Sequence, residues 1–200
     1  MNTIGHCTAC DLLITQEATL VTESNYSSFN LTADFIDYYT ISNASDLYWF
    51  ADLVNNSKPT ANAVLTADIV VNENVLNEDG TLNGTPTYSW TPIGTYSKNY
   101  KGTFDGNGHT ISGLYFNNAT DGNYPNGGDY VGLIGYGQAV TIKNVGVIDS
   151  YLKGRQYVGG ICGCSNYQST IINCYNTGTI SGTSDFIGGI CGAYGSQTNC

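Results

Sequence analysis

The sequence predicts an all-β fold, a right-handed parallel β-helix that begins with a capping helix. Three observations predict this fold: the composition, a repeat in the last third of the chain, and apolar runs too short for helices. Charged residues make up 11% of the 200 residues, whereas Gly, with 25 copies, and Tyr, with 16, are abundant. Gly tolerates the positive φ angles of tight turns, and Tyr suits the pleated surface of a strand. The composition therefore favours short strands joined by turns.

A repeat with three copies runs from Val131 to the end of the sequence. Each copy opens on a β-branched residue followed by glycine, and these openings, at Val131, Val158 and Ile187, lie 27 and 29 residues apart. An asparagine before an apolar or cysteine residue then marks the second half of each copy, at Asn144, Asn173 and Asn199. The apolar runs between them are short and separated by Gly, Asn or Ser. A period of this length is typical of one turn of a solenoid.

Turns stacked in register would place like residues above like, about 4.8 Å apart. The three copies then predict three columns of stacked side chains, Val131/Val158/Ile187, Ile134/Ile161/Ile190 and Val145/Cys174/Cys200. The first copy reads Gly132-Leu133 where the later copies read Gly-Gly, a departure expected to change packing only. A β-sandwich with coincidental glycine spacing is the alternative architecture.

Two parts of the repeat resemble a known family. Val158-Gly-Gly-Ile-Cys-Gly and Asn173-Cys-Tyr-Asn-Thr-Gly-Thr-Ile-Ser-Gly182 resemble the GLUG repeat of bacterial surface proteins. Trp90–Gly94 and Tyr100–Phe116 resemble the segment that opens such repeats in adhesin-like proteins, and a similar segment occurs in the non-catalytic region of IgA-specific zinc metallopeptidases. The resemblance covers residues 39–200. It implies a non-catalytic structural or adhesive module of a secreted or cell-surface bacterial protein.

The segment before the repeat predicts a cap for the solenoid. Residues 40–56 are typical of a helix, because Asn43 can cap it and Asp46 lies three residues on. One face of that helix is apolar and carries Leu47, Phe50, Ala51 and Val54. A solenoid must hide its terminal turn, so this helix is expected to cover the first turn, ahead of a strand over 63–71.

The rest of the chain is expected to divide into a tail, a solenoid and its loops. Residues 1–38 show weak periodicity and are interpreted as a tail or the end of an upstream module, and 39–200 as the β-helix. Residues 72–89 and 117–129 are polar and are predicted to project as loops, where binding tends to occur. The third copy breaks off at Cys200, so further repeats of the same polypeptide are expected at that end, and the given chain is expected to fray or self-associate from about Gly182.

The charge of the chain excludes some classes of partner. The formal net charge is −10 with six Lys and Arg, so the basic footprint of a nucleic-acid-binding protein is missing. The apolar runs are too short to cross a membrane, and Met1 is not followed by a signal peptide. The expected partner is a host or matrix protein or a glycan, and the resemblance implies an extracellular or bacterial cell-surface location.

The sequence predicts no catalytic, cofactor or metal site. His6, Cys7 and Cys10 form half of a zinc knuckle, and a metal, a local disulfide or free thiols remain open for the two cysteines. Asp105 and His109 flank a Gly-Asn-Gly turn, whereas glycoside hydrolysis needs two carboxylates beside a groove. The turn interpretation is favoured over a polysaccharide-cleaving or carbohydrate-binding β-helix, which is the alternative function.

Two further groups of residues are considered for ligand chemistry. An oxygen-rich segment could hold Ca²⁺ through side chains at Asp121, Asn123, Asn126 and Asp129, but its Gly-Gly-Asp motif occurs once. The later cysteines fall at repeat positions, and in-register neighbours hold their Cβ atoms farther apart than the roughly 3.8 Å of a disulfide. Buried free thiols are therefore favoured over disulfides for Cys162/Cys191 and Cys174/Cys200, and Cys164 is predicted to face outward.

Overall fold

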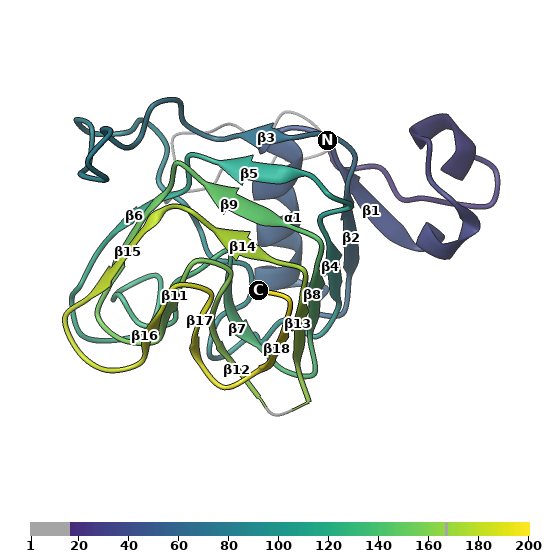
Figure 1. Ribbon diagram of the computed structural model, residues 1–200. Helices are drawn as coiled ribbons and strands as arrows, with labels where there is room; N and C mark the ends of the chain where they lie inside the picture. The colour runs from purple at the N-terminus through teal and green to yellow at the C-terminus, as the bar shows by residue number, and fades with distance from the viewer. Residues whose placement is uncertain (1–16, 167) are drawn as a thin grey trace, which may run out of the picture.

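Among the residues that the structure describes, the protein folds as a stack of parallel sheets with one α-helix near the N-terminal end (Figure 1). The computed structural model describes residues 17–166 and 168–200. The first elements are the 3-10 helices η1 (Tyr26–Phe29) and η2 (Ala33–Phe35), strand β1 (Tyr38–Ile41) and helix α1 (Ala44–Asn56). This mainly β, solenoid-like architecture confirms the coarse prediction from the sequence.

In the described part of the chain, seventeen short strands follow α1. They are β2 (Asn62–Leu65), β3 (Ile69–Val70), β4 (Thr103–Asp105), β5 (Thr110–Ser112), β6 (Tyr115–Asn117), β7 (Ile134–Gly137), β8 (Thr141–Lys143), β9 (Gly146–Ile148), β10 (Tyr151–Gly154), β11 (Val158–Gly159), β12 (Cys162–Ser165), β13 (Thr170–Ile172), β14 (Tyr175–Asn176), β15 (Thr179–Gly182), β16 (Ile187–Gly188), β17 (Cys191–Ala193) and β18 (Ser196–Thr198). Successive turns of the chain lie side by side in Figure 1.

Each turn of the chain adds one strand to each of several sheets. The largest sheet has the order β1-β2-β4-β8-β13-β18, and the second largest has the order β14-β9-β5-β3. The remaining sheets have the orders β15-β10-β6, β17-β12-β7 and β11-β16. All paired strands within these sheets are parallel. Parallel pairing between strands one turn apart is what a solenoid requires.

The first predicted column is confirmed, and the second contains an error. Val131 pairs with Val158, which pairs with Ile187. Ile134, however, pairs with Cys162 rather than with Ile161. The first copy is one residue shorter than the second between its opening valine and this strand. The departure at Gly132-Leu133 is therefore a deletion, not a substitution.

Corners divide apolar segments of the chain into short strands that belong to different sheets. The predicted strand over 63–71 is split into β2 and β3, which belong to different sheets. The segment from Val158 is split in the same way into β11 and β12. A bend at residues 66–67 changes the direction of the chain between β2 and β3. Short strands broken by polar corners are the expected geometry of a narrow solenoid.

The capped helix is confirmed, with two changes at its start. The Asn43 side chain accepts a hydrogen bond from Asp46 N at 3.0 Å, as predicted for a cap. The Asp46 carboxylate reaches back to Ser42 N at 2.9 Å, one residue before the position that a capping box uses. Residues 40–41, predicted as helix, belong instead to β1. The cap at Asn43 explains the change, because it fixes the first helical residue after it.

The apolar face of α1 packs on the first turns of the solenoid. Leu47, Phe50, Ala51 and Val54 are buried, as predicted. The Phe50 ring lies 6.0 Å from the Tyr100 ring and 6.2 Å from the Phe104 ring, centroid to centroid. These helix residues belong to the main apolar cluster of the core, which also contains Trp90. The helix therefore covers the apolar core at the N-terminal end of the solenoid.

Residues 17–37 pack on the outside of the first strands. Leu20 bridges Tyr39 in an antiparallel sense, and Val21 N donates to Tyr38 O at 2.7 Å. Val21 and Leu31 form a small apolar cluster with Val64, whose side chain leaves the main core. The cysteines at positions 7 and 10, considered above for metal or disulfide chemistry, lie outside the described residues.

The strands with the highest numbers are expected to exchange their amide hydrogens fastest. β14, β15, β16, β17 and β18 each stand last in their sheet within the described part of the chain, so one edge of each is unpaired there. Hydrogen exchange followed by mass spectrometry should therefore show less protection in 183–200 than in β12 and β13, which are each paired on both sides. Equal protection of both segments in a monomeric sample would contradict this prediction.

Candidate functional site

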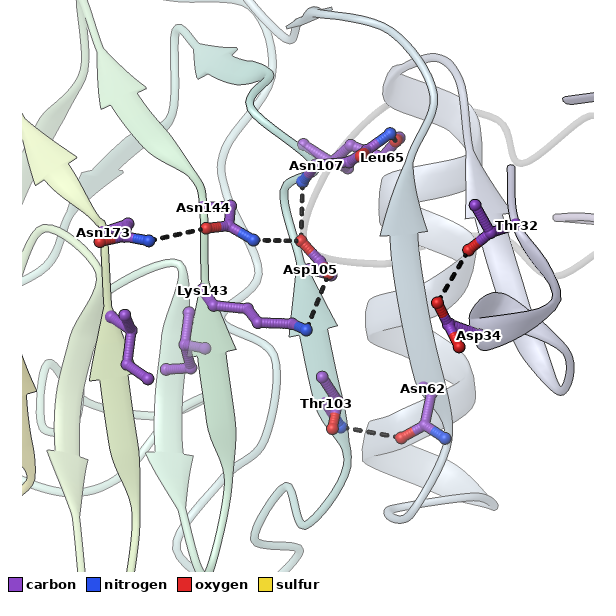
Figure 2. Close-up of polar contacts among 12 residues, drawn as sticks. Thr32, Asp34, Asn62, Leu65, Thr103, Asp105, Asn107, Lys143, Asn144 and Asn173 are labelled. Atoms are coloured by element: carbon purple, nitrogen blue, oxygen red, sulfur yellow. Dashed lines mark hydrogen bonds and ion pairs between the residues drawn. The ribbon is translucent and has the colours of Figure 1, made fainter. Parts of the chain in front are cut away.

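The turn from Asp105 to His109 does not pair the carboxylate of Asp105 with the imidazole of His109. Asp105 Oδ1 accepts hydrogen bonds from Asn107 N at 2.8 Å and from Asn144 Nδ2 at 3.1 Å, and Oδ2 lies 3.1 Å from Lys143 Nζ (Figure 2). His109 instead lies 3.4 Å from Asp68, which belongs to the preceding turn. The Asp105 carboxylate is buried and engaged by these three donors, so the structure favours the turn interpretation of this motif.

Asp105 ends a ladder of amide side chains that runs through the stack. Asn199 Nδ2 donates to Asn173 Oδ1 at 3.2 Å, and Asn173 Nδ2 donates to Asn144 Oδ1 at 3.1 Å. Figure 2 shows the step from Asn173 through Asn144 to Asp105. Each amide nitrogen donates to the side chain on the turn with lower residue numbers. The last side chain of the ladder therefore only has to accept a hydrogen bond, and a carboxylate is a group that only accepts. Lys143 balances its charge.

The three asparagines of this amide ladder share one backbone conformation. Asn144, Asn173 and Asn199 have φ angles of 56°, 52° and 53°, in the left-handed region. Asparagine enters that region more readily than most residues. Each of these asparagines therefore has two roles, because its backbone forms the corner and its side chain forms a hydrogen bond to the neighbouring turn.

Other carboxylates also hold the backbone in place. Asp149 accepts from Val75 N at 3.1 Å and from Leu76 N at 2.9 Å. Asp68 accepts from Thr110 N at 2.8 Å, and this backbone hydrogen bond is the main cause that lowers the pKa of the Asp68 carboxyl. These contacts give each carboxylate a structural role.

The loop over 72–89 is attached to three successive turns. Asn72 Nδ2 donates to Gly113 O at 2.8 Å, which fixes the start of the loop. Asp149 holds the next residues as described above, and Thr179 Oγ1 donates to Gly80 O at 2.6 Å. The tip of the loop therefore lies against β15 instead of being attached only at its ends.

An arginine holds the second loop, over 117–129. Arg155 Nε and Nη2 donate to the two oxygens of the buried Asp129 at 2.8 and 2.7 Å, and Gln156 Nε2 donates to Asp129 at 3.0 Å. Arg155 Nη2 also lies 2.8 Å from Asp121 Oδ1. The carboxylates considered for Ca²⁺ are thus bound to a guanidinium. Across 17–166 and 168–200, no three His, Cys, Asp or Glu residues gather as a metal site.

Replacing Arg155 with alanine is expected to loosen this loop without unfolding the solenoid. The substitution leaves the buried Asp129 carboxylate without its two charge-assisted hydrogen bonds, so residues 117–129 should detach locally. Limited chymotrypsin digestion should then cut near Tyr124 severalfold faster than in the unsubstituted chain. Lys153→Ala is the matched control, and equal cutting of both variants would contradict the proposed role of Arg155.

Aromatic side chains form a column along one corner of the solenoid. The rings of Tyr130, Tyr157 and Phe186 stack with centroids 4.7 Å apart at each step and planes 4° and 3° from parallel. Their φ angles are 63°, 54° and 63°. The same left-handed corner in each turn directs the three side chains alike, and the spacing of parallel strands, about 4.8 Å, then stacks them.

Further tyrosines extend this column into an exposed aromatic corner, defined as Tyr96, Tyr130, Tyr136, Tyr157, Phe186 and Tyr194. Tyr96 stacks on Tyr130 at 5.5 Å, and Tyr136 packs edge-on against Tyr130 at 5.3 Å. The exposed fractions of Tyr96, Phe186 and Tyr194 are 56%, 48% and 54%. Exposed aromatic surface of this kind marks interaction sites. The signal was present in the sequence, because an aromatic residue precedes each of the three repeat openings.

The cysteines of the repeat are free thiols, and most are buried. Cys162 and Cys174 are buried, in line with their interpretation as core residues. Cys164 was predicted to face outward and is 3% exposed, so that prediction is wrong as to accessibility. Burial is the main cause that raises the pKa of the Cys164 thiol to about 12. Its surroundings therefore suppress thiolate chemistry.

Comparison with known proteins identifies part of the repeat. Residues 154–181 match the GLUG motif. The matched segment contains β11 to β14 in full and most of β15, so one full turn of the solenoid corresponds to one copy of the motif. The resemblance inferred from the sequence is thereby confirmed for this turn.

Two individual proteins are similar to the chain over part of their length. Halomucin of Haloquadratum walsbyi is 37% identical over 99 residues, which are 49% of this chain and 1% of that protein. A crystal structure of a candidate immunoglobulin A1 protease from Bacteroides ovatus matches with a TM-score of 0.49 and 22% identity, over 74% of this chain and 39% of that one. The chain thus spans a small part of the first protein and less than half of the second.

No helix in the described ranges is both long and apolar enough to cross a membrane.

Proposed function

We propose that this chain is a non-catalytic structural or adhesive module of a secreted or cell-surface protein. In this proposal the solenoid acts as a rigid scaffold that holds an exposed contact surface. The winding is right-handed, because crossover connections between parallel strands are right-handed in almost every known case. The match of 154–181 to the GLUG motif supports the repeat architecture on which the proposal rests.

The proposal of a non-catalytic role is supported by the hydrogen bonds and ion pairs that hold the carboxylates in place. Glycoside hydrolysis needs two carboxyl groups, one on each side of the bond that is cleaved. Asp105, Asp129 and Asp149 are instead bound to donors that belong to the fold. A carboxylate held in this way is a poor general acid or base, because protonation or movement would break the contacts that position it.

The aromatic corner is the surface that we propose for contact with a partner. Exposed aromatic rings are enriched at the centres of protein interfaces, where they supply contact area with little loss of side-chain entropy. Tyr96 and Phe186 end the stacked column, and among the described residues each of the two rings is stacked on one other ring only. The partner in this proposal is a host or matrix protein.

Carbohydrate binding is the second candidate function, and the same surface favours it. Sugars bind aromatic rings through the ring faces, and the faces of Tyr130 and Tyr157 are covered by their stacked neighbours. The two terminal rings would therefore make the contacts. The excess of acidic residues favours neutral over anionic glycans.

A binding screen with matched variants tests both candidates. The chain would be incubated with matrix proteins and with neutral and acidic glycans, and both binding and product release would be measured. Phe186→Ser and Tyr96→Ser should lower binding at least tenfold, whereas Tyr175→Ser, an equally exposed ring away from the corner, should not. Release of a cleaved product would contradict the non-catalytic proposal. Antibody labelling of intact cells would test the surface location.

A further inference from the structure

Two thiols lie opposite one another on neighbouring turns of the solenoid. Cys162 in β12 pairs in register with Cys191 in β17. The contact between the two thiols is the main cause that raises the pKa of Cys162 and lowers the pKa of Cys191. Cys162 is fully buried, and Cys191 is partly exposed.

We propose that Cys162 and Cys191 form a disulfide site that covalently links the turns carrying β12 and β17. The proposal goes beyond a scaffold role, since it assigns a covalent modification to residues that also pack as small apolar side chains. It does not depend on the partner proposed above.

The register makes this link geometrically accessible. In-register parallel residues have Cα atoms about 4.8 Å apart, inside the range of roughly 4.4–6.8 Å found in disulfides. The Cβ atoms must approach by about 1 Å to reach the usual separation. β17 can make this movement, because β12 is its single neighbour in the sheet order β17-β12-β7 and its other edge is unpaired in the described structure.

The two cysteines have different accessibility, which sets the order of the reaction. With oxidised glutathione as the oxidant, the Cys191 thiolate attacks one sulfur of the glutathione disulfide, and one glutathione leaves as a thiolate that takes up a proton. Cys162 then loses its proton and attacks the Cys191 sulfur of the mixed disulfide, and the second glutathione leaves. Two protein thiols are oxidised, and one glutathione disulfide is reduced to two thiols. Disulfides persist in oxidising extracellular surroundings.

The link is expected to stabilise one end of the solenoid more than the whole. Each turn of a solenoid contacts its neighbours alone, so a crosslink between two turns restrains mainly those turns. Oxidation should therefore slow hydrogen exchange in residues 183–193 severalfold and change exchange in 40–65 little.

Glutathione redox buffers and peptide mapping test the site in the full 200-residue chain. After oxidation, free thiols are blocked with an alkylating agent, and the protein is digested with pepsin at acidic pH, where disulfides do not exchange. We expect a linked pair of peptides containing Cys162 and Cys191, lighter by two hydrogens, in both the unsubstituted chain and the Cys164→Ala control. Cys162→Ala should trap glutathione on Cys191, whereas Cys191→Ala should leave Cys162 unmodified.

Three results would overturn the proposal. The first is that both thiols remain reduced in a buffer that oxidises solvent-exposed dithiols. The second is that Cys191 accumulates as a glutathione mixed disulfide although Cys162 is present. The third is that the crosslink joins Cys174 to Cys200 and leaves Cys162 and Cys191 free. Cys174 and Cys200 serve as the internal comparison, since their thiols also interact.

Discussion

Replacing Phe50 with alanine is expected to lower the free energy of unfolding by about 4 kcal/mol. Phe50 is 0% exposed, and its ring packs against Tyr100 and Phe104 where α1 meets the first turns. Truncating this ring removes its apolar contacts and leaves a cavity between the helix and the solenoid, which cannot collapse because strands fix the opposite wall. Urea denaturation followed by circular dichroism would measure the change.

The control for this prediction lies on the same helix. Leu53 is partly buried and packs at the margin of the core, so Leu53→Ala should cost about 1 kcal/mol. Both substitutions keep a good helix former in the helix, and the difference between them therefore reports packing against the solenoid rather than helix propensity. Equal costs would show that α1 does not hold the end of the core.

The sequence was sufficient to predict the features that depend on local spacing. The helix from Ala44 to Asn56 followed from its cap and its apolar periodicity. The Val131/Val158/Ile187 column followed from the repeat, because parallel turns in register stack residues that occupy equal positions. In both cases the structural rule acts between residues whose relation is visible along the chain.

The sequence was insufficient where one residue changes the register. Aligning the copies on their isoleucines placed Ile134 beside Ile161, although a missing residue in the first copy moves it to Cys162. A shift of one residue reverses which face a side chain occupies, so small errors in alignment cause large errors in placement. The burial of Cys164 was missed as well, because the spacing of a repeat does not show which side chains cover a strand residue.

Contacts between the loops and the stack were also beyond local reasoning. Asp149 binds the backbone of Val75 and Leu76, and Arg155 binds Asp129, over separations of 73 or 74 and 26 residues. Such partners become neighbours through the winding of the chain, and no short motif marks them. The candidate contact surface was missed for a different reason, because the aromatic residue before each repeat opening was visible but was not included in the repeat.

Replacing Asp105 with alanine is expected to lower the free energy of unfolding by about 3 kcal/mol. The substitution removes the acceptor for Asn107 N and Asn144 Nδ2 and the counter-charge of Lys143. The amide ladder then ends on an unsatisfied donor of the half-buried Asn144. Asp79→Ala is the control, because that exposed carboxylate bonds to Thr81 within its own turn and should cost at most about 0.5 kcal/mol.

Asp105→Asn separates the hydrogen bonds of Asp105 from its charge. The amide oxygen can still accept from both Asn107 N and Asn144 Nδ2, which share one oxygen in the native site. The amide nitrogen would face Lys143, whose side chain is 36% exposed and can turn to solvent, so the expected cost is about 1 kcal/mol. Urea denaturation of the three variants should rank Asp105→Ala lowest in stability, then Asp105→Asn, then Asp79→Ala. If Asp105→Asn were as unstable as Asp105→Ala, the ion pair rather than the end of the amide ladder would be the stabilising contact.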